Sequence, residues 1–228
     1  MSAAEPIALT LHVDDSHSVD GLYLAATNAR ALLVLGHGAG AGMTHPSMAT
    51  LANELHALDV STLRYQFPYM QRGSKRTDPP ALCHATVRAA VHKARELAPN
   101  DPLFAGGRSF GGRMTSQAQA LQPLPAVQGL VFFAFPLHPA GKPGTDRAEH
   151  LANIAIPMLF LQGTEDALAS LELLRPVIEH LGPRATLKLL EHADHSFHVP
   201  ARTGRRDPDV RREALETAAN WMTSIAQA

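Results

Sequence analysis

Short apolar runs recur along the whole chain and predict the strands of a buried sheet. Residues 31–35 (ALLVL) and 127–135 are almost continuously apolar, which is typical of strands covered on both faces. An opening antiparallel pair is predicted with its turn around Gly21. The predicted strands cover residues 6–13, 22–26, 31–35, 61–67, 102–105, 127–135, 157–161 and 186–190.

Between these runs the apolar residues recur at helical spacing, as Met48, Leu51 and Leu55 do. The predicted helices cover residues 45–58, 79–98, 111–121, 168–181 and 209–225. This alternation predicts an α/β fold with a mostly parallel sheet and helices on both faces, where ligands bind at the carboxyl ends of the strands. Residues 71–78 and 137–149 are predicted surface loops, and neither is long enough to form a cap domain.

The sharpest motif is G-x-S-x-G at residues 107–111 (GRSFG), between a predicted strand and a predicted helix. This context is what a nucleophile elbow requires. The turn forces Ser109 into a strained backbone conformation, so its neighbours must lack side chains that would clash, and glycines supply that freedom. We therefore predict that the Ser109 hydroxyl projects above the sheet as a nucleophile.

A nucleophilic serine needs an acid and a histidine as partners. In this kind of strand–turn–helix site the acid follows the serine along the chain, and the histidine follows the acid. Asp166 comes just after the predicted strand at residues 157–161 and is the predicted acid, with Glu165 as the alternative. Asp166 could also cap the next helix. His195, in the loop after the last predicted strand, is the predicted base, with His192 and His198 as competitors.

The roles of these residues follow from acyl-transfer chemistry. Ser109 attacks a carbonyl carbon, His195 accepts the serine proton and later donates it to the leaving group, and Asp166 orients the imidazole. The oxyanion needs N–H donors, for which we predict Phe110, the residue after the nucleophile, and Ala39. Ala39 lies in a glycine-rich loop at residues 36–42 (GHGAGAG), directly after a buried strand.

The same glycine-rich loop also fits the pattern G-x-G-x-x-G/A of dinucleotide sites. That interpretation needs an acidic residue at the end of the next strand, but the sequence there is YQFP, and the Gly-Lys-Ser/Thr of a phosphate-binding loop is absent. We therefore expect no nucleotide, no other cofactor and no metal.

Four residues beside the predicted nucleophile are candidates for binding the substrate: His37, Gly38, Arg64 and Arg108. With the basic loop at residues 71–78, the arginines could favour an anionic acyl group. The alternative interpretation is structural, with Arg108 paired to a buried acid and the loop solvated.

Four segments together resemble the α/β-hydrolase superfamily. They are LGHGAG (35–40), LRYQFPYM (63–70), GRSFGGR (107–113) and ADHSF (193–197). The resemblance is strongest to compact serine hydrolases similar to dienelactone hydrolase, in a subgroup that includes a subunit of a eukaryotic histone acetyltransferase complex. It implies an eight-stranded, mostly parallel sheet flanked by helices, without a cap domain and without a cofactor. Dienelactone hydrolases use a cysteine where this chain has Ser109.

Composition narrows the class of protein. The chain has 228 residues, enough for a sizeable core, and we expect one domain over residues 1–228. The net charge of −1 argues against a nucleic-acid binder with a global basic field. The lone cysteine, Cys83, excludes an internal disulfide. Without a signal peptide or an apolar run of about 18 residues, we expect a cytoplasmic protein that does not enter membranes.

Two functions follow from these observations. The first is a serine hydrolase that cleaves a small carboxylic ester or thioester through an acyl-enzyme. The alternative is a non-catalytic interaction module that keeps the hydrolase fold. The expected partners are a small ester-type substrate and, at most, a second copy of the chain.

Overall fold

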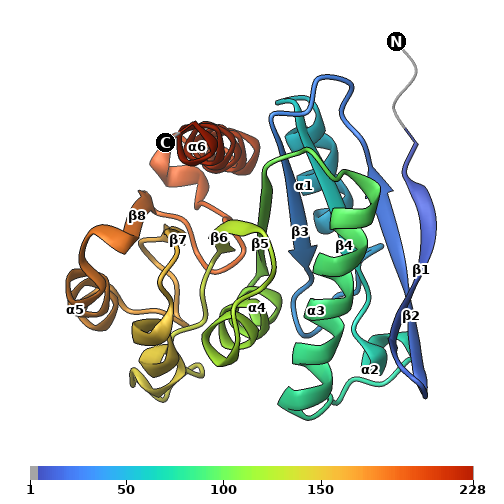
Figure 1. Cartoon of the computed structure of the whole chain (residues 1–228). Helices are drawn as coiled ribbons and strands as arrows, with labels where there is room; N and C mark the ends of the chain where they lie inside the picture. The colour runs from blue at the N-terminus through green and yellow to red at the C-terminus, as the bar shows by residue number, and fades with distance from the viewer. Residues whose placement is uncertain (1–4, 228) are drawn as a thin grey trace.

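An eight-stranded sheet forms the centre of the computed structural model, which describes residues 5–227 (Figure 1). Its strands are β1 (Ile7–Asp14), β2 (His17–Leu24), β3 (Ala31–Gly36), β4 (Val60–Tyr65), β5 (Leu103–Arg108), β6 (Val127–Phe133), β7 (Met158–Gly163) and β8 (Ala185–Leu190). Their order is β1-β2-β4-β3-β5-β6-β7-β8. Only β1 with β2 and β2 with β4 pair antiparallel, so the predicted mostly parallel sheet is confirmed.

Helices cover both faces of this sheet (Figure 1). Residues of α1 (Pro46–His56) and α6 (Asp207–Ala226) pack on one face, and residues of α3 (Pro80–Leu97), α4 (Phe110–Leu121) and α5 (Leu171–Leu181) on the other. Along β3, Leu32 and Val34 join the core under α3 and α4, whereas Leu33 and Leu35 join the core under α1 and α6. Because both faces are covered, every side chain of this strand is apolar.

Four shorter helices complete the secondary structure of residues 5–227. They are α2 (Pro68–Gln71), η1 (Asp146–Asn153), η2 (Gly182–Arg184) and η3 (Ala201–Thr203). The segment at residues 137–149, predicted to be a surface loop, instead has Leu137 and His138 buried, and η1 begins within it and packs against α4. The sequence did not predict this burial or this helix, because the Pro- and Gly-rich segment has no periodic pattern of apolar residues.

The predicted turn around Gly21 is wrong. Gly21 lies inside β2 opposite Leu9, and the hairpin turns at residues 15–16, where Asp14 Oδ1 accepts the N–H of Ser16. A Cβ at position 21 would lie 2.5 Å from a methyl of Leu11. Gly21 is therefore needed for packing across the hairpin rather than for a turn.

No helix within residues 5–227 is both long enough and apolar enough to span a bilayer.

Candidate active site

Ser109 lies at the sharp turn between β5 and α4, at the carboxyl edge of the sheet. Its φ of 48° and ψ of −113° place a non-glycine residue in a region that costs on the order of 1–3 kcal/mol. The backbone around the turn approaches the end of β3 closely, because a Cβ at Gly107 would lie 2.5 Å from the carbonyl oxygen of Gly36. The predicted elbow geometry is thus present, and the glycines permit it.

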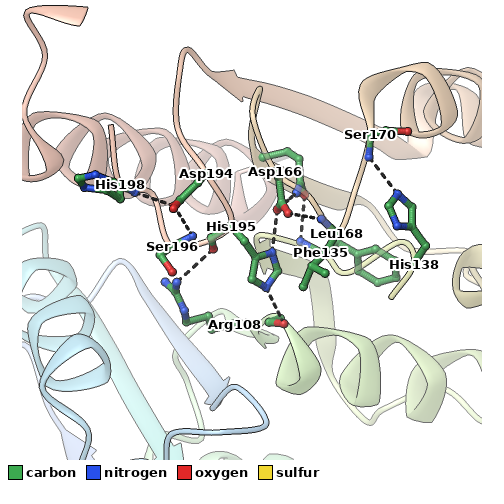
Figure 2. Close-up of polar contacts among 12 residues, drawn as sticks. Arg108, Phe135, His138, Asp166, Leu168, Ser170, Asp194, His195, Ser196 and His198 are labelled. Carbon is green, nitrogen blue, oxygen red and sulfur yellow. Dashed lines mark hydrogen bonds and ion pairs between the residues drawn. The ribbon is translucent and has the colours of Figure 1, made fainter. Parts of the chain in front are cut away.

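His195 lies between Asp166, which Figure 2 labels beside it, and Ser109. Its Nε2 lies 2.8 Å from Ser109 Oγ, and its Nδ1 lies 2.8 Å from Asp166 Oδ2. The Asp166 carboxylate is buried, whereas Ser109 and His195 are half-buried at the surface. With Nδ1–H donated to the carboxylate, Nε2 is free to accept the serine proton, which is the geometry of a general base.

The competing residues lie elsewhere. Glu165 is exposed, and the side chain of His198 pairs with Asp207 at 2.9 Å. His192 is exposed and contacts Thr164 through its backbone. The prediction that Asp166 opens the next helix is wrong, because α5 begins at Leu171 with Ser170 as its N-cap. Asp166 instead accepts the N–H of Leu168 on Oδ1, which fixes the carboxylate in a tight turn.

Gln162 is a site residue that sequence reasoning missed. It is fully buried at the end of β7, where its amide Nε2 donates to Asp166 Oδ2 and its Oε1 accepts the N–H of Phe135. One side chain thus ties the acid to the segment after β6. A polar residue in the otherwise apolar strand MLFLQG was the available signal.

Arg108 contacts the loop that carries His195. Its guanidinium donates to the carbonyl of His195 at 3.2 Å, as drawn in Figure 2, and lies 5.7 Å from the centre of the Phe197 ring. No ion pair of Arg108 is found within residues 5–227, so the predicted alternative of a buried acidic partner is wrong. These contacts favour a positioning role over the predicted contact with substrate.

The loop after β3 holds the predicted oxyanion donor Ala39. Over residues 5–227, no hydrogen bond uses the N–H of Ala39 or of Phe110, which leaves both free to donate. Phe110 is the first residue of α4, where N–H groups have no partner within the helix. Gly38, a predicted substrate contact, is half-buried, and its carbonyl accepts the Nδ1–H of His37.

The segment at residues 64–69, at the end of β4, fixes this loop at several points. His37 Nε2 accepts the N–H of Phe67 at 3.0 Å, and the Tyr69 hydroxyl donates to Ala39 O at 2.9 Å. The Arg64 guanidinium donates to Met43 O at 2.9 Å. Each contact holds the loop from which the oxyanion donor would point.

The predicted substrate-binding role of the His37 and Arg64 side chains therefore needs correction. His37 is fully buried and Arg64 is 3% exposed; the His37 ring accepts the N–H of Phe67, just after β4, and the Arg64 guanidinium donates to the carbonyl of Met43, just after the loop. Burial lowers the pKa of His37 to about 4, so the ring is neutral, with Nδ1 as donor and Nε2 as acceptor. Both residues support the loop instead of contacting a ligand.

Within the described part of the chain, no cluster of His, Cys, Asp or Glu side chains has the arrangement of a metal site. Cys83 is buried in α3 with its pKa raised to about 12 by burial, and it lies outside the group around Ser109.

Known proteins resemble this chain in sequence and in fold. The sequence model of a family described as alpha/beta hydrolase domain matches residues 29–223. An α/β serine hydrolase homologue from Coxiella burnetii superposes with a TM-score of 0.74 at 18% identity, covering 95% of this chain and 98% of that one. A lidless α/β serine hydrolase from Xanthomonas campestris gives 0.72 at 21% identity, covering 97% of each chain. A dienelactone hydrolase from Anabaena variabilis gives 0.73 at 18% identity, covering 98% and 97%.

Proposed function

Because the chain belongs to the α/β-hydrolase family, we propose that it is a serine hydrolase that cleaves a small carboxylic ester or thioester through an acyl-enzyme on Ser109. The observation that carries the proposal is the continuous hydrogen-bonded path from Ser109 Oγ through both nitrogens of His195 to the buried Asp166 carboxylate. A fold kept only for protein interaction would have no physical need for that path.

In the proposed reaction, Ser109 Oγ attacks the ester carbonyl carbon while its proton passes to His195 Nε2. The tetrahedral intermediate carries its negative charge on the former carbonyl oxygen. This oxygen accepts hydrogen bonds from the N–H groups of Phe110 and Ala39. His195 then gives the proton to the leaving oxygen or sulfur as the bond to carbon breaks. Water repeats the cycle on the acyl-enzyme and releases the acid.

Asp166 acts on His195 and not on the substrate. Its carboxylate accepts the Nδ1–H at 2.8 Å and stabilises the imidazolium that forms during each proton transfer. The Gln162 amide and the Leu168 N–H hold the two carboxylate oxygens in place. With both oxygens occupied, the carboxylate has one orientation toward the imidazole.

Labelling with a fluorophosphonate probe tests the proposal, because the probe reacts only with an activated serine. Mass spectrometry should place the adduct on Ser109, and Ser109→Ala and His195→Ala should abolish it. His198→Ala is the matched control, since it removes a histidine of the same loop that pairs with Asp207 outside the site. An absent adduct in correctly folded protein would favour the interaction module.

A further inference from the structure

His138 is a buried histidine in the segment that follows β6, and only 4% of it is exposed. Both nitrogens of its ring have partners. Nδ1 lies 3.0 Å from the carbonyl oxygen of Pro139, and Nε2 lies 3.2 Å from the backbone nitrogen of Ser170 (Figure 2). Because a backbone N–H can only donate, Nε2 is the acceptor, and the ring is neutral with its proton on Nδ1.

Ser170 lies at the end of the turn that begins with the acid. Inside this turn, Asp166 Oδ1 accepts the N–H of Leu168 at 2.8 Å, and the backbone carbonyl of Asp166 accepts the N–H of Ala169 at 3.1 Å. The backbone N–H of His138 donates to the carbonyl of Leu168 at 2.9 Å. His138 therefore holds the turn at residues 166–170 at two points, one through its backbone and one through its ring.

Two side chains thus connect the acid to the segment after β6, at opposite ends of the turn. Gln162 acts from the end of β7, where it joins the N–H of Phe135 to the carboxylate of Asp166. The ring of His138 acts where the turn enters α5, on the N-cap residue Ser170. The Ser170 side chain makes no capping hydrogen bond of its own. The imidazole is therefore the side chain that anchors this end of the turn.

A carboxylate stabilises the imidazolium only while the two groups stay aligned, and Asp166 Oδ2 lies 2.8 Å from His195 Nδ1. Among the hydrogen bonds of residues 5–227, none joins the His138 side chain to Ser109 or His195, so His138 takes no part in the proton transfers. We propose that His138 is a positioning residue whose ring, by accepting the Ser170 N–H, keeps Asp166 aligned with His195. This inference rests on the proposed serine-hydrolase function and adds to it a residue that sets the rate without touching substrate.

The first test compares three substitutions of His138 by the turnover of p-nitrophenyl acetate. His138→Leu fills the space without an acceptor. His138→Asn places its amide at the position of Nδ1, next to Pro139, but does not reach Ser170. His138→Gln places an amide oxygen near the position of Nε2, where it can accept the Ser170 N–H. The asparagine and glutamine variants thus separate the two hydrogen bonds of the ring.

His138→Leu and His138→Asn should each lower kcat by about tenfold, with KM changed by less than about twofold. KM is spared because acylation and deacylation both use the pair His195 and Asp166 and slow together. His138→Gln should keep kcat within about threefold of the unaltered protein. A role in packing alone would not favour glutamine over asparagine and leucine.

The second test asks whether His138 acts through Asp166. In the Asp166→Asn background, the further change His138→Leu should lower kcat by less than about twofold, because no carboxylate is left to align. His84→Leu is the matched control in the unaltered background. It removes a half-buried histidine whose hydrogen bond to Gln117 joins α3 to α4, and it should leave kcat unchanged.

An unchanged kcat in both His138→Leu and His138→Asn, an equal loss in His138→Gln, or a tenfold loss that persists in the Asp166→Asn background would each overturn the inference and leave the proposed function intact. Circular dichroism shows whether each variant has folded, and if His138→Leu does not fold, the asparagine and glutamine variants decide. If the unaltered protein turns over no ester and the fluorophosphonate probe forms no adduct, the proposed serine hydrolase itself is wrong, and the inference falls with it.

Discussion

Lowering the pH should destabilise the folded protein through His37, the buried histidine of the glycine-rich loop at residues 36–42. Burial lowers the pKa of His37 from its ordinary 6.5 to about 4, and the neutral ring accepts the Phe67 N–H. Between these values the unfolded chain binds a proton that the folded chain does not, so stability is complete above the unfolded pKa and falls as the pH drops. From about pH 7 to about pH 5, linkage gives a loss of about 1.8 kcal/mol.

His37→Gln isolates this contribution. The glutamine can still offer an acceptor to Phe67 but has no proton to gain in this range. Urea unfolding of both proteins at the two pH values gives two changes in the free energy of unfolding. All other titrating groups, His150 among them, are shared, so the unaltered protein should lose about 1.8 kcal/mol more than the variant.

The reasoning is refuted if both proteins lose the same free energy between the two pH values. That result would mean that the folded protein binds the proton at His37 as readily as the unfolded chain does. A difference in the free energy of unfolding that is the same at both pH values would not refute the reasoning, because the substitution itself changes packing. The folded protein itself binds this proton only near pH 4, where the protonated ring can no longer accept the Phe67 N–H.

Further predictions concern the neighbours of His195. Asp166→Asn should lower kcat by about 10³–10⁴-fold with the fold intact, because Nδ1–H loses its acceptor, and steady-state kinetics with circular dichroism would check this. Gln162→Leu leaves the Phe135 N–H unpaired in the interior and should cost about 1–3 kcal/mol in urea unfolding, whereas an unchanged midpoint would contradict the assigned bonds. Arg108→Met should lower kcat about tenfold with KM unchanged, and a raised KM alone would instead indicate substrate contact.

The positions of the strands along the chain and the elbow could be predicted from the sequence because they depend on local rules. Apolar runs such as residues 31–35 identify strands covered on both faces, and β3 confirms this with every side chain buried. The G-x-S-x-G pattern identifies a turn that only glycines permit, and the close approach of Gly107 to Gly36 confirms the need. The hairpin turn was missed because a glycine can serve packing as well as turning, and Gly21, inside β2, lies too close to Leu11 to carry a side chain.

The roles of the buried polar residues could not be predicted from local sequence patterns. His37 and Arg64 stood next to the predicted site in sequence, and proximity suggested contact with substrate. In the folded protein their side chains are buried and hydrogen-bond to the carbonyl groups of Gly38 and Met43. Which backbone group a buried donor finds depends on segments far apart in sequence, so no local pattern reports it.

By itself, the sequence determined the alternation of strands and helices, the turn at Ser109 and the chain order in which an acid and a histidine follow it. These features are set by side-chain periodicity and by the backbone freedom of glycine, both of which are local. Only the tertiary structure decided that His195 rather than His192 or His198 meets Ser109, and that Gln162 and Arg108 hold its surroundings. Such contacts form where loops from different strands converge at one edge of the sheet, and their geometry exists only after the sheet has assembled.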